Sequence, residues 1–303
     1  MIGDDRPYPA RGSARHDQFM TNRIVVGYDT SPSSTEAAHW AASEAATRRR
    51  MLQIVACYEI PLGAGVGAAW STGDVLDTFE KATLESAQSV KAVLTLRYPE
   101  LEIDVAACLG PPRALLIQGL DPTDVLVVGT SNHEGAAGFL LGSTSRWATR
   151  HSPCPVVVVR GAASRGRPDR IVVGIDGSVS SDAALLWAAD EADLHGVDLV
   201  VVHSWDYPYL GVDTHAAQAR DLTRIDAAIV LDRAAEFARQ RCGVTVKDVL
   251  VEASAASALL DSVRDGDVLV LGAEGRGAIA AGLLGSTVNS VVEQSAVPVV
   301  VVH

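Results

Sequence analysis

The chain repeats itself, and this repeat constrains the fold more than any other feature of the sequence. "RIVVGYDTSPSSTEAAHWAASEA" at residues 23–45 matches "RIVVGIDGSVSSDAALLWAADEA" at residues 170–192. "HSPCPVVVVR" at 151–160 matches "QSAVPVVVVH" at 294–303, and the matching segments come in the same order in both halves. A repeat of this length predicts two copies of one domain.

The segments between the matching stretches indicate the domain boundaries. We expect a disordered tail over 1–22, a first domain over 23–160, a linker over 161–169 and a second domain over 170–303. The tail is polar, contains Pro and Gly, and lacks the apolar core of a signal peptide. The linker has the Gly, Ser, Arg and Pro content of an exposed connection.

Within each copy, short runs of β-branched residues alternate with helical patterns. In the first copy, these runs predict strands near 23–28, 52–57, 101–107, 124–129 and 155–159, with helices near 33–49, 74–98, 111–119 and 142–150. Continuous apolar runs such as "VLVV" suit strands that are buried on both faces of a parallel sheet. The pattern predicts an α/β protein of two tandem doubly wound, Rossmann-like sandwich domains, with five strands each.

Charge and composition argue against several classes of function. The formal net charge is −12, and nucleic-acid affinity comes mainly from Lys and Arg that neutralise phosphates, so nucleic-acid binding is not expected. The longest apolar runs are shorter than the ~18 residues that cross a bilayer, so no membrane association is expected. The four cysteines are far apart and form no CxxC pair, which indicates a reducing, cytoplasmic setting.

The motifs of several other chemistries are missing. "VVGYDTSPSS" and "VVGIDGSVSS" do not supply G-x-G-x-x-G after the first strand, and G-x-x-x-x-G-K-[ST] is absent. The histidines show no helical pair at metal-ligand spacing, and "GSTS" and "GSTV" lack the G-x-S-x-G turn of a serine hydrolase. We therefore predict no catalytic residues and no metal-ligating residues.

A glycine-rich loop after the fourth strand of each copy is the candidate binding motif. In an open α/β sheet, ligands bind beyond the carboxyl ends of the strands. In the second copy, Gly272-x-x-Gly275 is expected to turn the backbone with φ > 0 and to leave no Cβ in the way. Gly285, Ser286 and Thr287 then open a helix, whose free N–H groups and dipole attract an anion. These features predict a polyphosphate cradle that needs no lysine.

An aspartate after the first strand completes the predicted site. Asp176 is expected to accept hydrogen bonds from ribose hydroxyls across the cleft, which makes the site a nucleotide site. Turn glycines and helix caps also occur without any ligand. We prefer the nucleotide interpretation because the spacing G-x2-G-x9-G-S recurs nearly intact in the other copy, together with Asp29.

Both halves resemble the universal stress protein family, and the whole chain resembles its tandem-domain form over about residues 22–303. The ATP-binding members of that family carry G-2x-G-9x-G-(S/T), which the second copy matches in full at Gly272, Gly275, Gly285 and Ser286. The resemblance also assigns Asp176 to the family's first loop and places the backbone of Ser204 against the adenine.

The resemblance implies a fold, a ligand and a mode of assembly. It implies a stress-response protein that binds an adenine nucleotide, namely ATP with or without Mg²⁺, and it leaves cyclic AMP as the alternative ligand. It also implies that the last strands of two domains, 155–159 and 297–302, pair across an interface. The protein is then a homo-oligomer or a domain pair within one chain. Not every member of the family binds ATP.

The first copy departs from the family pattern at one glycine. Its positions in the pattern are Asp29, Cys57, Gly110, Gly129, Asn132, Gly142, Ser143, Thr144 and Ser145. Asn132 replaces the second glycine of the motif, and asparagine is the residue other than glycine that best tolerates a left-handed backbone. Gly110 belongs to the loop after the third strand, which in the family lies near the adenine.

The second copy departs at other positions. Ser254 replaces the counterpart of Gly110, and Val288 stands where the first copy has Ser145, so that one hydroxyl near the phosphates is lost. Arg276 follows Gly275 and could supply charge to the phosphates or remain in solvent. We predict that both copies bind nucleotide and that the phosphate loop of the second copy is the more secure.

Three classes of function remain open. The first, which we prefer, is a nucleotide-binding regulator whose ATP occupancy biases its conformation or assembly. The second is a slow ATPase or self-phosphorylating enzyme, with weak hydrolysis at most because no dedicated general base is apparent near the γ-phosphate. The third is a partner-binding structural module that takes no nucleotide.

Overall fold

The computed structural model describes residues 22–59, 72–130, 141–160, 167–206, 216–276 and 284–303. Almost all of the expected tail and most of the expected linker therefore lie outside the described residues. The first half contains β1 (Ile24–Tyr28), α1 (Pro32–Arg48), β2 (Leu52–Tyr58), α2 (Thr72–Arg97), β3 (Ile103–Leu109), α3 (Pro112–Leu115), β4 (Val125–Gly129), α4 (Ser143–His151) and β5 (Val156–Val159). The second half repeats this order with β6 (Arg170–Gly174), α5 (Val179–His195), β7 (Asp198–Trp205), α6 (Ala216–Arg241), β8 (Val246–Glu252), α7 (Ala255–Ser262), β9 (Val268–Gly272), α8 (Ser286–Gln294) and β10 (Val299–Val302).

The first helix of each half shows how the local sequence sets the element bounds. The side chains of Ser31 and Ser178 cap α1 and α5 by accepting hydrogen bonds from backbone N–H groups three residues further along. Each helix ends at a residue in the left-handed conformation, Arg49 after α1 and Gly196 after α5. Equivalent stop and start signals give the two helices equal lengths of 17 residues.

The strands of both halves join into one sheet of ten strands, in the order β3-β2-β1-β4-β5-β10-β9-β6-β7-β8. Within each half all neighbouring strands are parallel, as the alternation of strands and helices predicts. The halves meet where β5 and β10 pair antiparallel, with Val157 opposite Val300. The predicted fold class is therefore confirmed, including the pairing of the final strands across the domain interface.

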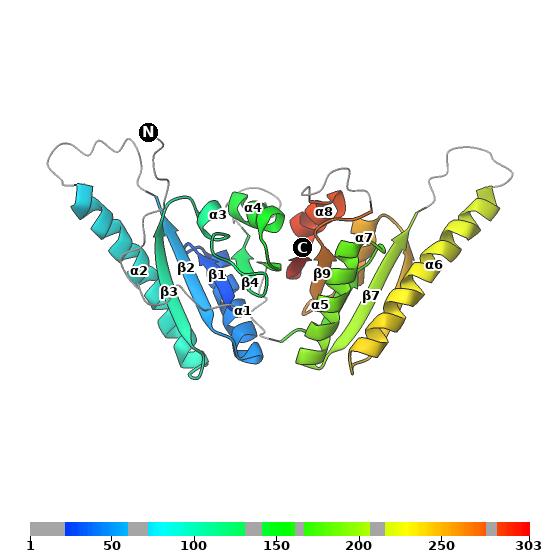
Figure 1. Ribbon diagram of the computed structural model, residues 1–303, viewed down its shortest axis with the longest axis horizontal. Helices are drawn as coiled ribbons and strands as arrows, with labels where there is room; N and C mark the ends of the chain where they lie inside the picture. The colour runs from blue at the N-terminus through cyan, green and yellow to red at the C-terminus, as the bar shows by residue number, and fades with distance from the viewer. Residues whose placement is uncertain (1–21, 60–71, 131–140, 161–166, 207–215, 277–283) are drawn as a thin grey trace, which may run out of the picture.

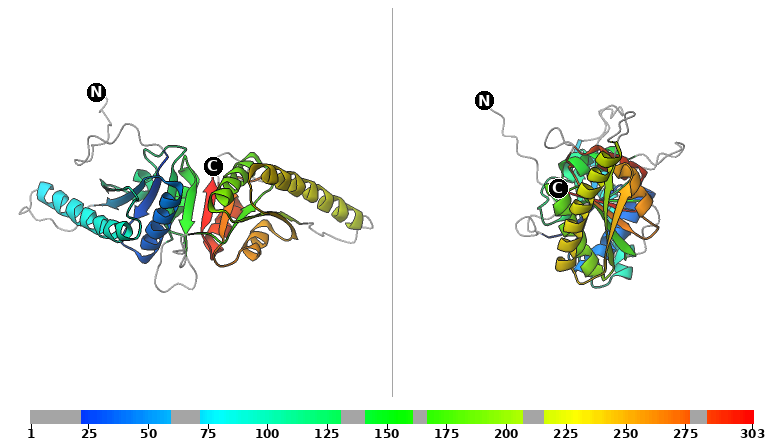
Figure 2. Two further views of the ribbon diagram at one scale, coloured as in Figure 1. Left: turned by 90° about the horizontal axis from the view of Figure 1, so that it is seen from below. Right: turned by 90° about the vertical axis from the view of Figure 1, so that its right-hand side faces the viewer.

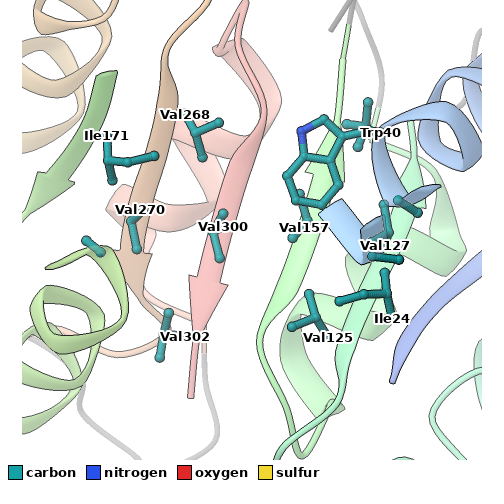
Figure 3. Close-up of a cluster of buried hydrophobic side chains, with 14 of the residues drawn as sticks. Ile24, Trp40, Val125, Val127, Val157, Ile171, Val268, Val270, Val300 and Val302 are labelled. Atoms are coloured by element: carbon teal, nitrogen blue, oxygen red, sulfur yellow. The ribbon is translucent and has the colours of Figure 1, made fainter. Parts of the chain in front are cut away.

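The helices cover the sheet on both faces. One buried cluster joins the sheet to α1, α2, α5 and α6, and a second joins its other face to α4, α7 and α8. Neighbouring strand residues alternate between the clusters, as Ile24 and Val25 do. Figure 3 shows the first cluster at the junction of the halves, where Trp40 packs beside Val157 and faces the valines of β10.

The two halves lie side by side, and each has its long helix on the outer side. In Figure 1 the long helices α2 and α6 form the two outer flanks, whereas α1 and α5 lie toward the middle of the molecule. Figure 2 shows the strands of both halves continuing through the centre, where β5 and β10 are neighbours. Among the described helices, none is long and apolar enough to cross a membrane.

Candidate functional site

The second half has a cavity of about 450 Å³ beyond the carboxyl ends of β6, β7 and β9. Every residue of this half predicted to bind the ligand lies on its wall: Asp176, Ser204, Gly272, Gly275, Arg276, Gly285, Ser286, Thr287 and Val288. Apolar side chains that the sequence did not single out, such as Leu259 and Leu271, close the inner end. The cavity lies at the edge of the sheet where open α/β proteins bind their ligands.

The first half has a corresponding cavity of about 270 Å³ between its described walls. The predicted residues on its wall are Asp29, Cys57, Gly129, Gly142, Ser143, Thr144 and Ser145. Gly110 is not part of the wall; its N–H donates to the Tyr58 carbonyl at 2.9 Å, and the neighbouring turn supplies Pro112 and Leu116 instead. Asn132 lies outside the described residues.

The glycines of the loop after β9 allow close packing of the backbone. The prediction that they turn the backbone with φ > 0 is wrong. Neither Gly272 nor Gly275 has a positive φ. A Cβ on Gly272 would lie 2.5 Å from the backbone carbonyl carbon and oxygen of Ser180, and a Cβ on Gly275 would lie 2.8 Å from Asp176 Oδ2. Gly129 approaches Ser33 in the same way, at 2.5 Å. The loop after β9 therefore needs glycine because it passes against the start of α5 and against Asp176.

The helices α4 and α8 begin at these cavities with open N-termini. Gly142 and Gly285 occupy the N-cap positions, and neither offers a side chain to cap the helix. In α8 the first intrahelical bond runs from the Asn289 N–H to the Gly285 carbonyl at 3.1 Å. The N–H groups of Ser286, Thr287 and Val288 come before that bond, and these three residues line the cavity. This end of the helix carries a partial positive charge that favours an anion.

The Gly285 N–H holds this helix start against the glycine loop by donating to the Ala273 carbonyl at 3.1 Å. By contrast, a Cβ on Gly285 would have 3.7 Å to its nearest neighbour, so the protein itself leaves space at this position. The open helix start therefore has a defined place relative to the loop.

Ser145 lines the first cavity, and its hydroxyl already has a partner within the protein. Its Oγ is buried and donates to the Gly129 carbonyl at 2.6 Å, so it joins α4 to the end of β4. Val288, the counterpart of Ser145, packs into the apolar cluster under α8. The exchange of serine for valine thus replaces a hydrogen bond between helix and strand with apolar packing.

Asp176 lies on the wall of the second cavity and links the loop after β6 to the loop after β9. Its Oδ1 accepts a hydrogen bond from the Ser178 N–H at 2.9 Å, and its Oδ2 accepts one from the Arg276 N–H at 2.8 Å. Burial alone would raise the pKa of Asp176, but the hydrogen bonds from Ser178 and Arg276 lower it below its ordinary value. The carboxylate is therefore charged and fixed in place.

Asp29 has the equivalent position in the first half. Its Oδ1 accepts a hydrogen bond from the Ser31 N–H at 3.1 Å. Burial opposes ionisation here too, whereas the hydrogen bonds from Ser31 and Ser34 bring the pKa of Asp29 below its ordinary value. The backbone after each aspartate is left-handed, with φ of 68° at Thr30 and 77° at Gly177.

Cys57 and Ser204 lie inside their strands, each one residue before the last residue of β2 and β7. Cys57 of β2 lies opposite Cys108 of β3 in the sheet, and Ser204 of β7 lies opposite Val251 of β8. Burial, with smaller effects from Cys108 and Glu59, raises the pKa of Cys57 to about 12, so the thiol on the cavity wall is uncharged. All four cysteines of the chain are free.

Two serines at the start of α5 hold the glycine loop in place, and the sequence analysis did not single them out. Ser178 Oγ donates to the Glu274 carbonyl at 3.4 Å, and Ser180 Oγ accepts a hydrogen bond from the Glu274 N–H at 3.2 Å. These two bonds fasten the glycine loop to the helix. The recurring serine runs "SPSS" and "SVSS" after each first strand were the signal that could have indicated them.

Comparison with known proteins gives an independent result. A family model described as the universal stress protein family matches residues 20–160 and again residues 168–303. A universal stress protein of Mycobacterium tuberculosis strain H37Rv is 29% identical over 302 residues, which cover 92% of this chain and 95% of that protein. Another universal stress protein of the same strain is 30% identical over 299 residues, which cover 92% of this chain and 94% of that protein.

A solved structure has the same architecture. The crystal structure of a universal stress protein from Archaeoglobus fulgidus superposes with a TM-score of 0.65 and 18% sequence identity, covering 94% of this chain and 99% of that chain. At this identity the likeness concerns the fold alone. With both halves matched by the same family model, the chain belongs to the universal stress protein family, in which it has the tandem arrangement of two domains.

Proposed function

We propose that the chain binds adenine nucleotides, foremost ATP, in its two cavities, and that occupancy biases its conformation or assembly. The observation that carries the proposal is the open N-terminus of α8 on the wall of the second cavity, which the Asp176 carboxylate also lines. A polyphosphate needs donors and positive potential, and a helix start supplies both without a lysine.

Each part of a nucleotide has a partner in this arrangement. The phosphates would accept hydrogen bonds from the N–H groups of Ser286 and Thr287, and the Ser286 hydroxyl adds a donor. Asp176 accepts two N–H groups in the structure, and a carboxylate has about four lone-pair sites, so ribose hydroxyls can still donate to it. The backbone at Ser204 and the apolar wall at Leu259 are left for the base.

The role of a regulator follows from linkage. A ligand that binds only the folded form, present at 100 times its Kd, stabilises that form by about 2.7 kcal/mol. The loops that would touch the nucleotide already join β6, β9 and the start of α5. Nucleotide binding would therefore stabilise this end of the sheet. The same linkage would shift assembly if a second copy binds the occupied form better.

The alternative functions are weaker but testable. Slow ATP hydrolysis would need a base, and the lowered pKa of Asp176 makes that carboxylate a poor one. Within the described ranges, a grouping of potential metal ligands occurs at Glu44, Glu191 and His195, which line neither cavity.

We also keep the cytoplasm as the proposed compartment, because the cysteines are free.

The first experiment is to purify the protein without added nucleotide, denature it, and identify and count the nucleotide released per chain. Two ATP per chain would support binding at both cavities, and one would indicate that the copies have diverged. If none is released and none is taken up when ATP or cyclic AMP is added, the proposal fails. A partner-binding module without nucleotide then remains.

A second experiment locates the phosphates. Proline is tolerated at the first position of a helix, and Gly285 has φ −59° and ψ 147°, which suits a residue before proline. Ser286→Pro therefore removes one N–H and the hydroxyl while the helix is retained, and Ser286→Ala removes the hydroxyl alone. Loss of the N–H, one charge-assisted hydrogen bond worth about 1.5–3 kcal/mol, predicts about tenfold to hundredfold weaker ATP binding to Ser286→Pro than to Ser286→Ala.

The matched control is Val179→Pro, which introduces proline at the same position of α5. Val179 is exposed and lies off the cavity wall, and the first half already has Pro32 at the equivalent position. This variant should bind ATP like the wild type in isothermal calorimetry. Unchanged affinity in Ser286→Pro would show that the phosphates lie elsewhere.

A further inference from the structure

Four charged side chains are buried together where α1 of the first half meets α5 of the second. Glu44, Arg48, Glu191 and His195 have side chains that are 2–13% exposed. Arg48 pairs with both carboxylates, using Nε for Glu44 and Nη2 for Glu191. His195 Nε2 lies 3.1 Å from Glu44 Oε2 and 3.0 Å from Glu191 Oε1. Each carboxylate thus has one oxygen toward the arginine and the other toward the histidine.

The repeat explains this composition. "AASEAATR" at 41–48 aligns with "AADEADLH" at 188–195, so Glu44 is the counterpart of Glu191 and Arg48 the counterpart of His195. Packing two like domains against each other therefore brings two carboxylates together. Two carboxylates out of reach of water need two positive charges nearby. One half supplies a permanent charge and the other supplies a group that is charged only when protonated.

We propose that His195 makes the packing of the two domains depend on protonation: the imidazolium supplies the second positive charge for the two facing carboxylates, and its loss at alkaline pH weakens the contact between α1 and α5. The pairing of β5 with β10 does not involve these groups. The change therefore concerns the helix side of the interface, and the common sheet persists.

The other charged groups around the cluster do not replace this proton. They are Arg50, Arg160, Arg167, Asp190, Asp265 and Asp267. Asp267 pairs with Arg170, and Asp190 pairs with Arg241, so both carboxylates have cations of their own. The arginines Arg50, Arg160 and Arg167 donate hydrogen bonds to backbone carbonyls, those of Thr123, Val292 and Gly196. Arg50 also attracts Glu44 and Glu191 through space. Arg48 and His195 are the groups bonded directly to the two carboxylates, so the proton on His195 changes the charge at the shortest distance.

The direction of the pH effect follows from the histidine. Burial alone would lower the pKa of His195, but its hydrogen bonds to Glu191 and Glu44 raise it from 6.5 to about 9. Burial and the charge of Glu44 also raise the pKa of Glu191. Both groups hold protons in the folded state that the unfolded chain releases. The stabilisation from the His195 proton is complete below pH 6.5 and is lost as pH rises through about 9. The stabilisation from the Glu191 proton is complete below pH 4.5 and is lost as pH rises through about 7. Between pH 7 and 9 both carboxylates are therefore charged, and the imidazolium supplies the second positive charge.

Glu44 affects stability in the opposite direction, and it does so in another pH range. Although burial opposes its ionisation, hydrogen bonding to His195 and the charge of Arg48 lower the pKa of Glu44 to about 2. Its contribution is present above the ordinary value of 4.5 and is lost only in acid, as pH falls toward 2. The two effects do not overlap between pH 6 and 9.

A metal ion is the competing occupant of this cluster. The ligand atoms of Glu44, Glu191 and His195 lie within 4.8 Å of one another, close enough to share one ion. Arg48 touches both carboxylates and would repel a cation there. The protonated histidine fits the arrangement better, and a chelator distinguishes the two cases.

The test compares the pH dependence of unfolding of the full chain with that of His195→Arg, which installs the cation found at the equivalent position of the first half. Urea unfolding is followed between pH 6 and 9. From the shift of the His195 pKa, we expect the unfolding equilibrium constant of the wild type to rise on the order of tenfold to hundredfold more than that of the variant. A small cavity of about 60 Å³ beside His195 gives the larger side chain room.

A second variant, His195→Gln, and the fluorescence of Trp187 test the proposal in two further ways. His195→Gln cannot take up a proton, so it should be less stable than the wild type at pH 6 and should lack the same pH dependence. Trp187, whose ring lies under the Arg48 guanidinium at 5.6 Å, reports on the contact by fluorescence. The change of the wild type between pH 7 and 9 should disappear in Trp187→Phe and in His195→Arg.

Two outcomes would overturn the proposal. In one, wild type and His195→Arg lose stability in parallel from pH 6 to 9. In the other, EDTA abolishes the pH profile or added Zn²⁺ restores it, which would assign the cluster to a metal ion. Addition of either reagent is expected to leave the profile unchanged.

Discussion

Replacement of Gly272 by alanine tests whether the glycine after β9 is needed for packing. A Cβ at this position would lie 2.5 Å from the backbone of Ser180, where carbon contacts are ordinarily about 3.5–4.0 Å. The obstacle is the first turn of a capped helix, which cannot move like a side chain. Overpacking costs about 1–3 kcal/mol, and we expect the upper part of that range. For a domain of this size, that loss lowers Tm by about 4–12 °C.

The assay is thermal unfolding without nucleotide, so that ligand binding does not contribute. Gly285→Ala is the matched control, because its Cβ would have 3.7 Å to the nearest atom. It should cost less than about 1 kcal/mol, the scale of an N-cap exchange. Gly129→Ala should repeat the large loss in the first half, since its Cβ would meet Ser33 at 2.5 Å. Equal melting of Gly272→Ala and Gly285→Ala would refute the packing argument.

Three further predictions concern strain, a buried ion pair and a thiol. Thr30 has a φ of 68°, a strained value for a β-branched residue, whereas its counterpart is Gly177. Thr30→Gly should therefore raise the free energy of unfolding by about 1 kcal/mol in a urea titration. No gain in this free energy would argue against strain at Thr30. Asp267 is buried and pairs with Arg170, so Asp267→Ala should cost about 3–5 kcal/mol in the same assay, and a loss below about 1 kcal/mol would contradict this. The pKa of Cys57 is raised to about 12, so mass spectrometry should detect much slower alkylation of Cys57 at pH 8 in the native chain than in urea; equal rates would show that the thiol is accessible and reactive.

Much of the site was predictable because its position depends on topology. Parallel strands with crossover helices bring the loops after the first, second and fourth strands to one edge of the sheet. Asp176, Ser204 and Gly275 are far apart in the sequence, yet they lie on one cavity wall. The open start of α8 was also predictable, because a Gly-Ser pair before a periodic segment marks a helix start.

The contacts within the site were not predictable in the same way. The function of Gly272 depends on how closely β9 passes the start of α5, and the function of Ser145 depends on its reach to the Gly129 carbonyl. The sequence led us to expect a turn with φ > 0 at the first and a phosphate ligand at the second. The first expectation was wrong, and the second stays a prediction, because Ser145 lines the first cavity while its hydroxyl bonds to Gly129. The partners of both residues belong to segments whose distance no local pattern encodes.

The sequence by itself determined the two-domain architecture, the order of the elements, the edge of the sheet that carries the cavities and the family. These properties follow from periodicity, turn residues and the repeat, which act locally or through a general rule of handedness. Only the tertiary structure decided which groups meet across the interface. Glu44 and His195 are 151 positions apart, and they form a charged cluster because β5 and β10 pair and bring α1 against α5. Burial there removes water from the charges, so their protonation depends on neighbours from the other half of the chain.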